Sequence, residues 1–308
     1  MVQTTPAPGT ELTPTTPARP PKRGVALMGR RRWLREVGWR HLIGVIAVLW
    51  SLFPITYIVS AAFNPAGSVT SSSVIPTTFS SLNFHKLFQT SFPTWVGNSL
   101  IVCATVTFVQ ILFSALAAYA FSRLRFAGRR GGLMALLLIQ MFPQFLAVVA
   151  LYLMFSDIGT SFPMIGLNTL LGYILMMCGN SLGQVWLIKG FFDTVPRTLD
   201  EAAMIDGASH VQTFFRILLP LIRPVLAVCA LLVFIGVIGD YLLASIFLTD
   251  TAKKTVAVGL YGLISGSRSQ NLGVFCAGAL LTAVPVMILF LFLQRFIVGG
   301  VTAGGVKE

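Results

Sequence analysis

Six long apolar windows constrain the fold of this chain more than any other feature. They cover residues 42–63, 99–121, 131–155, 167–188, 224–248 and 272–296. A membrane-spanning helix needs about 20 mostly apolar residues, and each window is apolar on all sides rather than along one stripe. Only 10% of the 308 residues are charged, whereas soluble domains have about 25%. We therefore expect an all-α, polytopic membrane protein with six transmembrane helices.

Lys and Arg are distributed unevenly among the segments that flank these windows. Eighteen of the 22 lie in the N-terminal segment, the turn after the second window, the loop after the fourth window and the C-terminal end. The other connections hold Lys86, Lys253, Lys254 and Arg268. Because cytoplasmic loops carry the excess of Lys and Arg, both termini are predicted to be cytoplasmic. The formal net charge of +12 therefore indicates orientation and attraction to anionic lipid headgroups rather than nucleic-acid binding.

Composition divides the chain into three segments. Residues 1–40 begin with a stretch in which six Pro and six Thr occur within the first 21 residues, which is typical of a disordered tail, and continue as a basic segment. Residues 41–298 form the transmembrane domain, and residues 299–308 form a glycine-rich cytoplasmic tail. No signal peptide is expected, because the first apolar run is as long as a full span.

The sequence shows no pattern that indicates catalysis or metal binding. Its four cysteines, Cys103, Cys178, Cys229 and Cys276, all fall inside predicted spans without a CxxC spacing, and buried free cysteine behaves as a small hydrophobe. No HExxH, Walker A or GxGxxG pattern occurs. We expect neither a catalytic residue nor a metal or bound cofactor in this chain.

The most informative segment is the predicted cytoplasmic loop 189–223, which is too long to be a plain connection. Thr198 with Glu201 and Ser209 with Gln212 are both spaced as capping boxes, which open helices. Gly207 is suited to end the first of these helices, and Pro220 and Pro224 to end the second.

The first of these helices is expected to present small and apolar side chains at the aqueous boundary, namely Leu199, Ala202, Ala203 and Ile205. An amphipathic helix on the headgroups is the alternative. The acids Asp200, Glu201 and Asp206 match an anionic leaflet poorly. We therefore favour a protein partner that docks from the cytoplasm.

Seven residues of this loop form a recognisable pattern: Glu201-Ala202-Ala203, three residues, Gly207, nine residues, Ile217, one residue, Leu219-Pro220. The pattern resembles the EAA loop of importer permeases in the ATP-binding-cassette superfamily. The flanks VWLIKGFF, YLLASIFLTD and VTAGGVKE are similar to those of the smaller, six-span permeases for maltose-type oligosaccharides in the carbohydrate-uptake group. The resemblance covers residues 42–308.

This resemblance implies a mechanism and a set of partners. The short helix would be a coupling helix seated on a cytoplasmic nucleotide-binding ATPase dimer, which binds the ATP. An extracytoplasmic sugar-binding protein would deliver the substrate to a cavity between this chain and a second permease subunit, and the outer loop 249–271 would face the binding protein. The membrane would be the cytoplasmic membrane of a prokaryote. The implied ATPase-coupling residues are Glu201, Ala202, Ala203, Asp206, Gly207, Ile217, Leu219 and Pro220.

Polar residues inside the windows are candidates for the translocation path. Gln140 and Gln144, and likewise Asn180 and Gln184, are four residues apart, so each pair would lie on one helix face. Asp240 is the only acid inside a window that we assign as a span, and such a group should face the protein interior or water. All five could contact sugar hydroxyls or instead bond one span to another. Pro54, Pro143 and Pro285 are expected to bend their spans.

A self-sufficient secondary transporter or channel is the alternative function. Such carriers typically show paired halves and several intramembrane ionisable groups, and the sequence shows neither an internal repeat nor more than the one acid.

Overall fold

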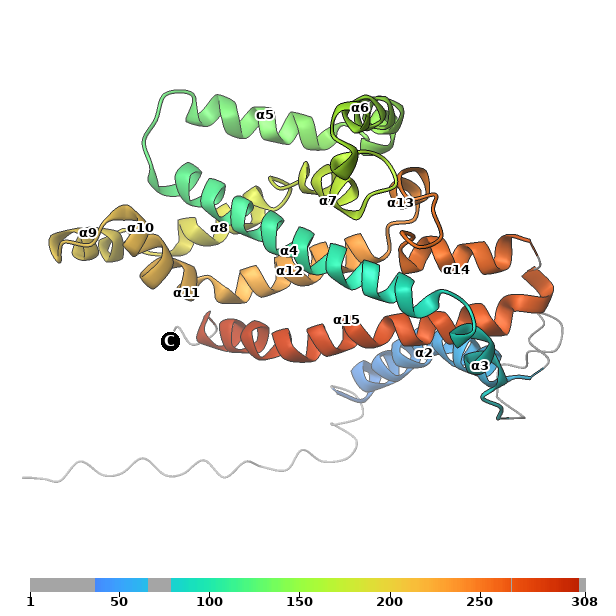
Figure 1. The fold of residues 1–308 in the computed structure, drawn as a ribbon. Helices are drawn as coiled ribbons and strands as arrows, with labels where there is room; N and C mark the ends of the chain where they lie inside the picture. Colours follow the sequence, from blue (N-terminus) through green and yellow to red (C-terminus); the bar gives the residue numbers. More distant parts are fainter. Residues whose placement is uncertain (1–36, 66–78, 267, 305–308) are drawn as a thin grey trace, which may run out of the picture. The chain divides into compact units, whose positions relative to one another are not determined.

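The computed structural model describes residues 37–65, 79–266 and 268–304, and all the regular elements in these ranges are helical. The residues fall into two compact units, Met1–Leu52 and Phe53–Glu308, with the boundary inside α2. Residues 1–36 of the predicted tail 1–40 lie outside the described residues. The elements are α2 (Trp39–Phe63), α3 (Leu82–Phe88), α4 (Phe92–Arg123), α5 (Arg129–Met141), η2 (Gln144–Ala147), α6 (Val148–Ser161), η3 (Pro163–Ile165), α7 (Leu170–Cys178), α8 (Val185–Thr194), α9 (Thr198–Ile205), α10 (His210–Gln212), η4 (Thr213–Leu218), α11 (Leu219–Leu221), α12 (Arg223–Ile238), α13 (Leu242–Phe247), α14 (Val256–Ser265) and α15 (Arg268–Gly304) (Figure 1).

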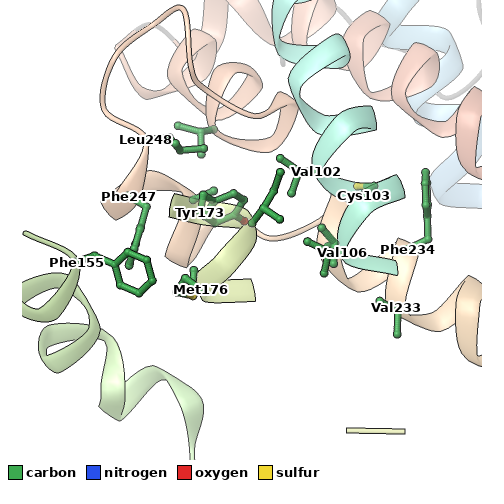
Figure 2. Close-up of a cluster of buried hydrophobic side chains, with 14 residues drawn as sticks. Val102, Cys103, Val106, Phe155, Tyr173, Met176, Val233, Phe234, Phe247 and Leu248 are labelled. Carbon is green, nitrogen blue, oxygen red and sulfur yellow. The ribbon is translucent and has the colours of Figure 1, made fainter. Parts of the chain in front are cut away.

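Helix α4 is the central element of the larger unit. It packs against α7, α8, α12 and α14, and it contributes side chains to all three buried clusters among the described residues. Figure 2 shows one of these clusters, in which Tyr173 from α7 lies near Val102 of α4 and Phe247 of α13. The second cluster joins α4 to α8, η4 and α12, and the third joins it to α3, α14 and α15.

Three helices in the described residues are long and apolar enough to cross a membrane by themselves: Trp39–Phe63, Phe92–Arg123 and Asn271–Ile297. They correspond to the first, second and sixth predicted windows. Two further helix pairs meet the same test together, although each is sharply bent. Arg129–Met141 and Phe145–Ser161 meet at 76°, and His210–Leu221 and Arg223–Ile238 meet at 79°. Length and composition therefore support three to five crossings.

The third, fourth and fifth windows are interrupted, which corrects the expectation of one continuous helix in each. Pro143 divides the third, because the residue before a proline is driven out of the helical region, and Phe142 is extended at φ −73° and ψ 125°. The fourth is divided between α7 and α8 by residues 179–184. The fifth is divided between α12 and α13 at residues 239–241. Both of these connections contain Gly together with Asn or Asp, which are weak helix formers.

The ends of several elements test the predicted helix signals. Ser209 and Gln212 form a reciprocal capping box, with distances of 3.3 Å from Gln212 N to Ser209 Oγ and 2.8 Å from Ser209 N to Gln212 Oε1. The capping box predicted for Thr198 and Glu201 is wrong. Helix α9 begins one residue earlier than a Thr198 cap would require, with Arg197 at the N-cap and no side-chain cap.

The C-terminal end of the chain is more helical than its composition suggests. Helix α15 continues to Gly304, so the backbone of residues 299–304 extends the sixth predicted span. Pro285 lies inside this helix and Pro54 lies inside α2.

Candidate functional site

Helix α9 carries the EAA residues and is the short helix that the loop pattern predicted. Along the chain it follows α8, and with α10 and α11 it lies at the end of α12 opposite α13 (Figure 1). Glu201 and Ala202 are exposed, whereas Ala203 is buried at 5% exposure. The expectation that Ala203 belongs to the exposed surface is therefore wrong. Its small side chain instead allows α9 to pack against η4.

The exposed face of α9 combines apolar and acidic side chains. Leu199, Met204 and Ile205 are exposed, with Ile205 at 86%. Glu201 and Asp206 are exposed beside them. An apolar patch rimmed by polar residues is typical of a protein interaction surface. This geometry agrees with docking of a protein partner.

Gly207 ends α9 with a Schellman motif. Its φ of +82° is in the left-handed region, which glycine adopts without the steric cost of a Cβ. Ala208 N donates to Ala203 O at 2.9 Å, and Gly207 N donates to Met204 O at 3.1 Å. Gly207 therefore acts as the predicted helix stop, and Asp206 occupies the C-cap.

The return from α9 to α12 passes through a widened helix. Ile217 lies in the π-helical stretch η4, and Leu219 and Pro220 begin α11; all three are half-buried. Proline lacks the N–H and crowds the carbonyl four residues earlier, which is a reason for the wider winding just before Pro220. The 79° bend follows at Ile222, before α12.

An aromatic cluster packs the return segment against α4 and α8. Tyr119 of α4, Phe192 of α8 and Phe214 of η4 have ring centroids 5.1 to 6.3 Å apart, within the range of favourable ring contacts. All three side chains are buried. The cluster joins η4, on which α9 packs, to two of the apolar helices.

A cavity of about 540 Å³ lies between α4, α5, α7, α12 and the connections that interrupt the windows. Its lining includes Gln140, Asn180, Gln184 and Asp240, four of the five predicted path residues. The fifth, Gln144, begins η2, and its side chain is outside the described part of the chain.

Neither pair lies on one helix face, although the sequence had predicted this for both. Gln140 is on α5 and Gln144 is on η2, with Pro143 between them. Asn180 and Gln184 lie in the connection between α7 and α8, where the spacing of 3.6 residues per turn does not apply. Tertiary packing, and not a helix face, brings Gln140, Asn180 and Gln184 to one cavity.

Asp240 bonds one interrupted window to another and also lines the cavity. Tyr173 Oη donates to Asp240 Oδ2 at 2.7 Å, and Ala244 N donates to the same oxygen at 2.9 Å. The structural bond that the sequence left as one of two alternatives is therefore present. Contact with a ligand remains open to Asp240 because it is part of the cavity wall.

Gln110 of α4 is a cavity residue that sequence reasoning missed. It is buried, its Nε2 donates to Met177 O at 2.8 Å, and it lines the cavity. Ser114, one turn further along α4, donates to Ser181 O at 2.5 Å. The sequence could have indicated Gln110, since Gln110 and Ser114 are four residues apart in an apolar window, as are the predicted pairs of path residues.

A comparison with known proteins identifies the class to which this fold and these sites belong. Residues 110–302 match the family described as "Binding-protein-dependent transport system inner membrane component". The chain belongs to this family of transport permease subunits and is a membrane protein, and no catalytic activity is indicated for it.

Several curated relatives are similar to this chain over most of its length. The chain is 40% identical to the maltodextrin transport system permease protein MdxG of Bacillus subtilis (strain 168) over 83% of this chain and 91% of that protein. It is 41% identical to the maltose/maltodextrin transport system permease protein MalG of Vibrio vulnificus (strain YJ016), over 90% and 96%. The galactooligosaccharides transport system permease protein GanQ of Bacillus subtilis (strain 168) is 37% identical, over 92% and 99%.

A solved structure agrees with the fold. A chain of a bacterial ABC transporter involved in the import of the acidic polysaccharide alginate matches with a TM-score of 0.71. The match covers 87% of this chain and 98% of that one at 23% sequence identity. The same kind of transporter in complex with a pentasaccharide-bound periplasmic protein matches with a TM-score of 0.62 at 17% identity.

Proposed function

We propose that this chain is one of two membrane-spanning subunits of an ATP-driven importer for maltose-type oligosaccharides. Its relatives at about 40% identity are permeases of maltose and maltodextrin systems, which supports this substrate class. In this proposal the chain crosses the membrane six times with both termini in the cytoplasm. The interrupted windows 131–155, 167–188 and 224–248 are three of the crossings.

The observation that carries the proposal is the exposed α9. It combines the EAA residues with an apolar and acidic outer face, at the start of the segment that bends into α12. A cytoplasmic nucleotide-binding ATPase dimer docks on this face, and the ATP is bound by those partners. Glu201, Asp206 and the exposed apolar side chains contact the ATPase. Gly207 ends the docking helix, and Ile217, Leu219 and Pro220 hold the return into α12.

The cavity supports a role in translocation. Its amide side chains from Gln110, Gln140, Asn180 and Gln184 provide donors and acceptors, and sugar hydroxyls need both. We place the substrate path along this cavity, shared with the second permease subunit, with Asp240 and Gln144 as further contributors. An extracytoplasmic sugar-binding protein delivers the oligosaccharide to the side where the loop 249–271 lies.

Reconstitution of the complex in vesicles tests the function. Uptake of maltodextrin is expected only with ATP, the ATPase subunits and the loaded binding protein. Asn180→Ala and Gln184→Ala are expected to lower uptake about tenfold, since a lost hydrogen bond to a bound ligand costs about 1 to 1.5 kcal/mol. Ser161→Ala, an exposed polar position outside the cavity lining, is the control. Uptake by the chain without an ATPase, driven by an ion gradient, would establish the secondary-transporter alternative instead.

A further inference from the structure

A buried ion pair joins α9 to the end of α4. Arg123 Nε lies 2.9 Å from Asp200 Oδ2, and the two side chains are 7% and 13% exposed. Arg123 is the last residue of α4, and Asp200 is in the first turn of α9. The pair therefore connects the helix with the EAA residues directly to the central helix of the larger unit.

The end of α4 also holds the segment that leads into α9. Arg123 Nη2 donates to Val195 O at 2.7 Å, so a single guanidinium contacts both the connection and the helix. Ser122 Oγ donates to Asp193 Oδ1 at 2.6 Å, and Ser122 O accepts from Arg197 Nη2 at 3.4 Å. Four contacts from two adjacent residues thus fix α9 and its approach to α4.

The pair is poorly optimised for stability, which favours a positional role. Arg123 Nε and both carboxylate oxygens of Asp200 are buried without an aligned hydrogen bond among the described residues. The carboxylate borders a cavity of about 130 Å³ that Tyr119, Arg197, Glu201 and His210 also line. Burial raises the pKa of Asp200 above its ordinary value, although Arg123 and Arg197 act in the opposite direction. A charge pair held in this way contributes little net stability, but it fixes the relative position of the two helices.

Helix α4 in turn connects this end to the cavity. Gln110 donates to Met177 O in the last turn of α7, and Ser114 donates to Ser181 O in the connection between α7 and α8. Gln110, Asn180 and Gln184 line the cavity. A displacement of α9 that carries Arg123 with it would therefore move residues of the cavity wall. Without the pair, α9 could move while α4 stayed in place.

We propose that Arg123 is a positioning residue that links the coupling helix α9 to α4, so that movement of the ATPase reaches the cavity. The proposal rests on the function proposed above and adds a specific mechanical contact to it. Arg123 acts through Asp200 and Val195 and does not itself touch the substrate.

Vesicles that contain the whole complex provide the test, and the measured quantity is sugar taken up per ATP hydrolysed. Arg123→Gln is expected to lower this ratio about tenfold, within the usual range of coupling between two sites, while the ATPase still co-purifies. Arg125→Gln is the matched control, because it removes the same charge from an exposed residue two positions further on; its ratio should stay within about twofold of wild type.

A double-mutant cycle separates the link from a general structural role. Asp200→Asn should lower the ratio as Arg123→Gln does, and the double variant should be no worse than either single variant, because partners in one interaction are not additive. Arg123→Lys should recover part of the ratio, since it keeps the charge beside Asp200. If Arg123→Gln does not assemble, Asp200→Asn and Arg123→Lys, which largely preserve side-chain volume, are compared in the same way.

An unchanged ratio in the assembled variants, or losses that multiply in the double variant, would overturn the proposal. Failure of the wild-type complex to couple uptake to ATP would instead contradict the proposed function, so the two failures are distinguishable.

Discussion

Two acids of the predicted cytoplasmic loop 189–223, Asp193 and Asp200, show how strongly the surroundings of a residue determine its ionisation. Asp193 is partly exposed, and hydrogen bonds from Lys189 and Ser122 outweigh the effect of its burial and lower its pKa. Asp200, seven residues later, has a raised pKa because its burial outweighs the nearby Arg123. The two side chains are chemically identical, so the difference arises entirely from which neighbours the fold supplies.

Asp193 is expected to make stability dependent on pH at the acidic end. A lowered pKa in the folded state means that its stabilisation is present above the ordinary value of 3.8 and is lost as the pH falls through the lowered pKa. Asp193→Asn should therefore reduce the thermal midpoint of the purified complex at pH 7, and the gap to wild type should narrow as the pH falls below 3.8 toward the lowered pKa. Asp157→Asn, at an exposed acid on α6, serves as control. A gap that stays constant with pH would argue against this account.

At the scale of elements, α4 is bonded along its whole length to segments that are distant in sequence. Asn98 Nδ2 donates to Ala252 O and Lys254 O at 3.0 Å, and Trp95 Nε1 donates to Thr251 O at 3.1 Å. These bonds are at the end of α4 opposite Arg123. Most of the bonds that α4 makes to distant segments run from a side chain to a backbone carbonyl in a non-helical segment. They pair carbonyls that would otherwise lack a hydrogen-bond donor, which a membrane-embedded fold must avoid.

Close packing of α14 on Trp95 leads to a prediction about one glycine. A Cβ on Gly259 would lie 2.1 Å from Trp95 Cε3, so Gly259→Ala must displace a buried ring. Such overpacking typically costs about 1 to 3 kcal/mol, and the thermal midpoint of the complex should fall by several degrees. Gly262→Ala lies on the same helix with nothing within 4 Å of its Cβ; it should leave the midpoint unchanged or slightly higher. Equal midpoints for the two variants would refute the packing argument.

For the whole molecule, the arrangement of crossings determines which surfaces would meet the proposed ATPase and which the proposed binding protein. Within the part of the chain that the structure describes, three helices are continuous and apolar enough to cross alone, whereas the windows between them are bent or interrupted. The interruptions supply the polar connections that line the cavity. Non-helical backbone at membrane depth is tolerated where it is enclosed by protein or lines a water-filled cavity, which agrees with this position.

Labelling of single cysteines with a membrane-impermeant reagent tests the proposed topology. Lys86→Cys, on the exposed side of α3, should react in intact spheroplasts, and Arg125→Cys should react only after permeabilisation, because Lys- and Arg-rich turns are cytoplasmic. The native thiols give a low background, since Cys103, Cys229 and Cys276 are buried and Cys178 is half-buried. Reaction of both new cysteines from the same side would rule out the six-span arrangement.

Several features were predictable because they depend on neighbouring residues along the chain. The capping box at Ser209 and the helix stop at Gly207 were correct, since local hydrogen bonds and a left-handed φ determine them. Ala203 was wrongly predicted to be exposed, because its burial depends on packing against η4 and not on the residues of its own helix. The basic residue Arg123 was assigned to orientation alone, since its partner Asp200 is 77 positions away.

By itself, the sequence determined that this is a helical membrane protein with an EAA-type loop, because apolar length, the distribution of Lys and Arg, and motif spacing are properties of the linear chain. Only the tertiary structure decided that Gln110, Gln140, Asn180, Gln184 and Asp240 meet at one cavity and that Arg123 holds α9. The physical reason is that long-range contacts arise from the packing of helices, and the breaks at Pro143 and residues 179–184 turn side chains away from the faces that an unbroken helix would give them.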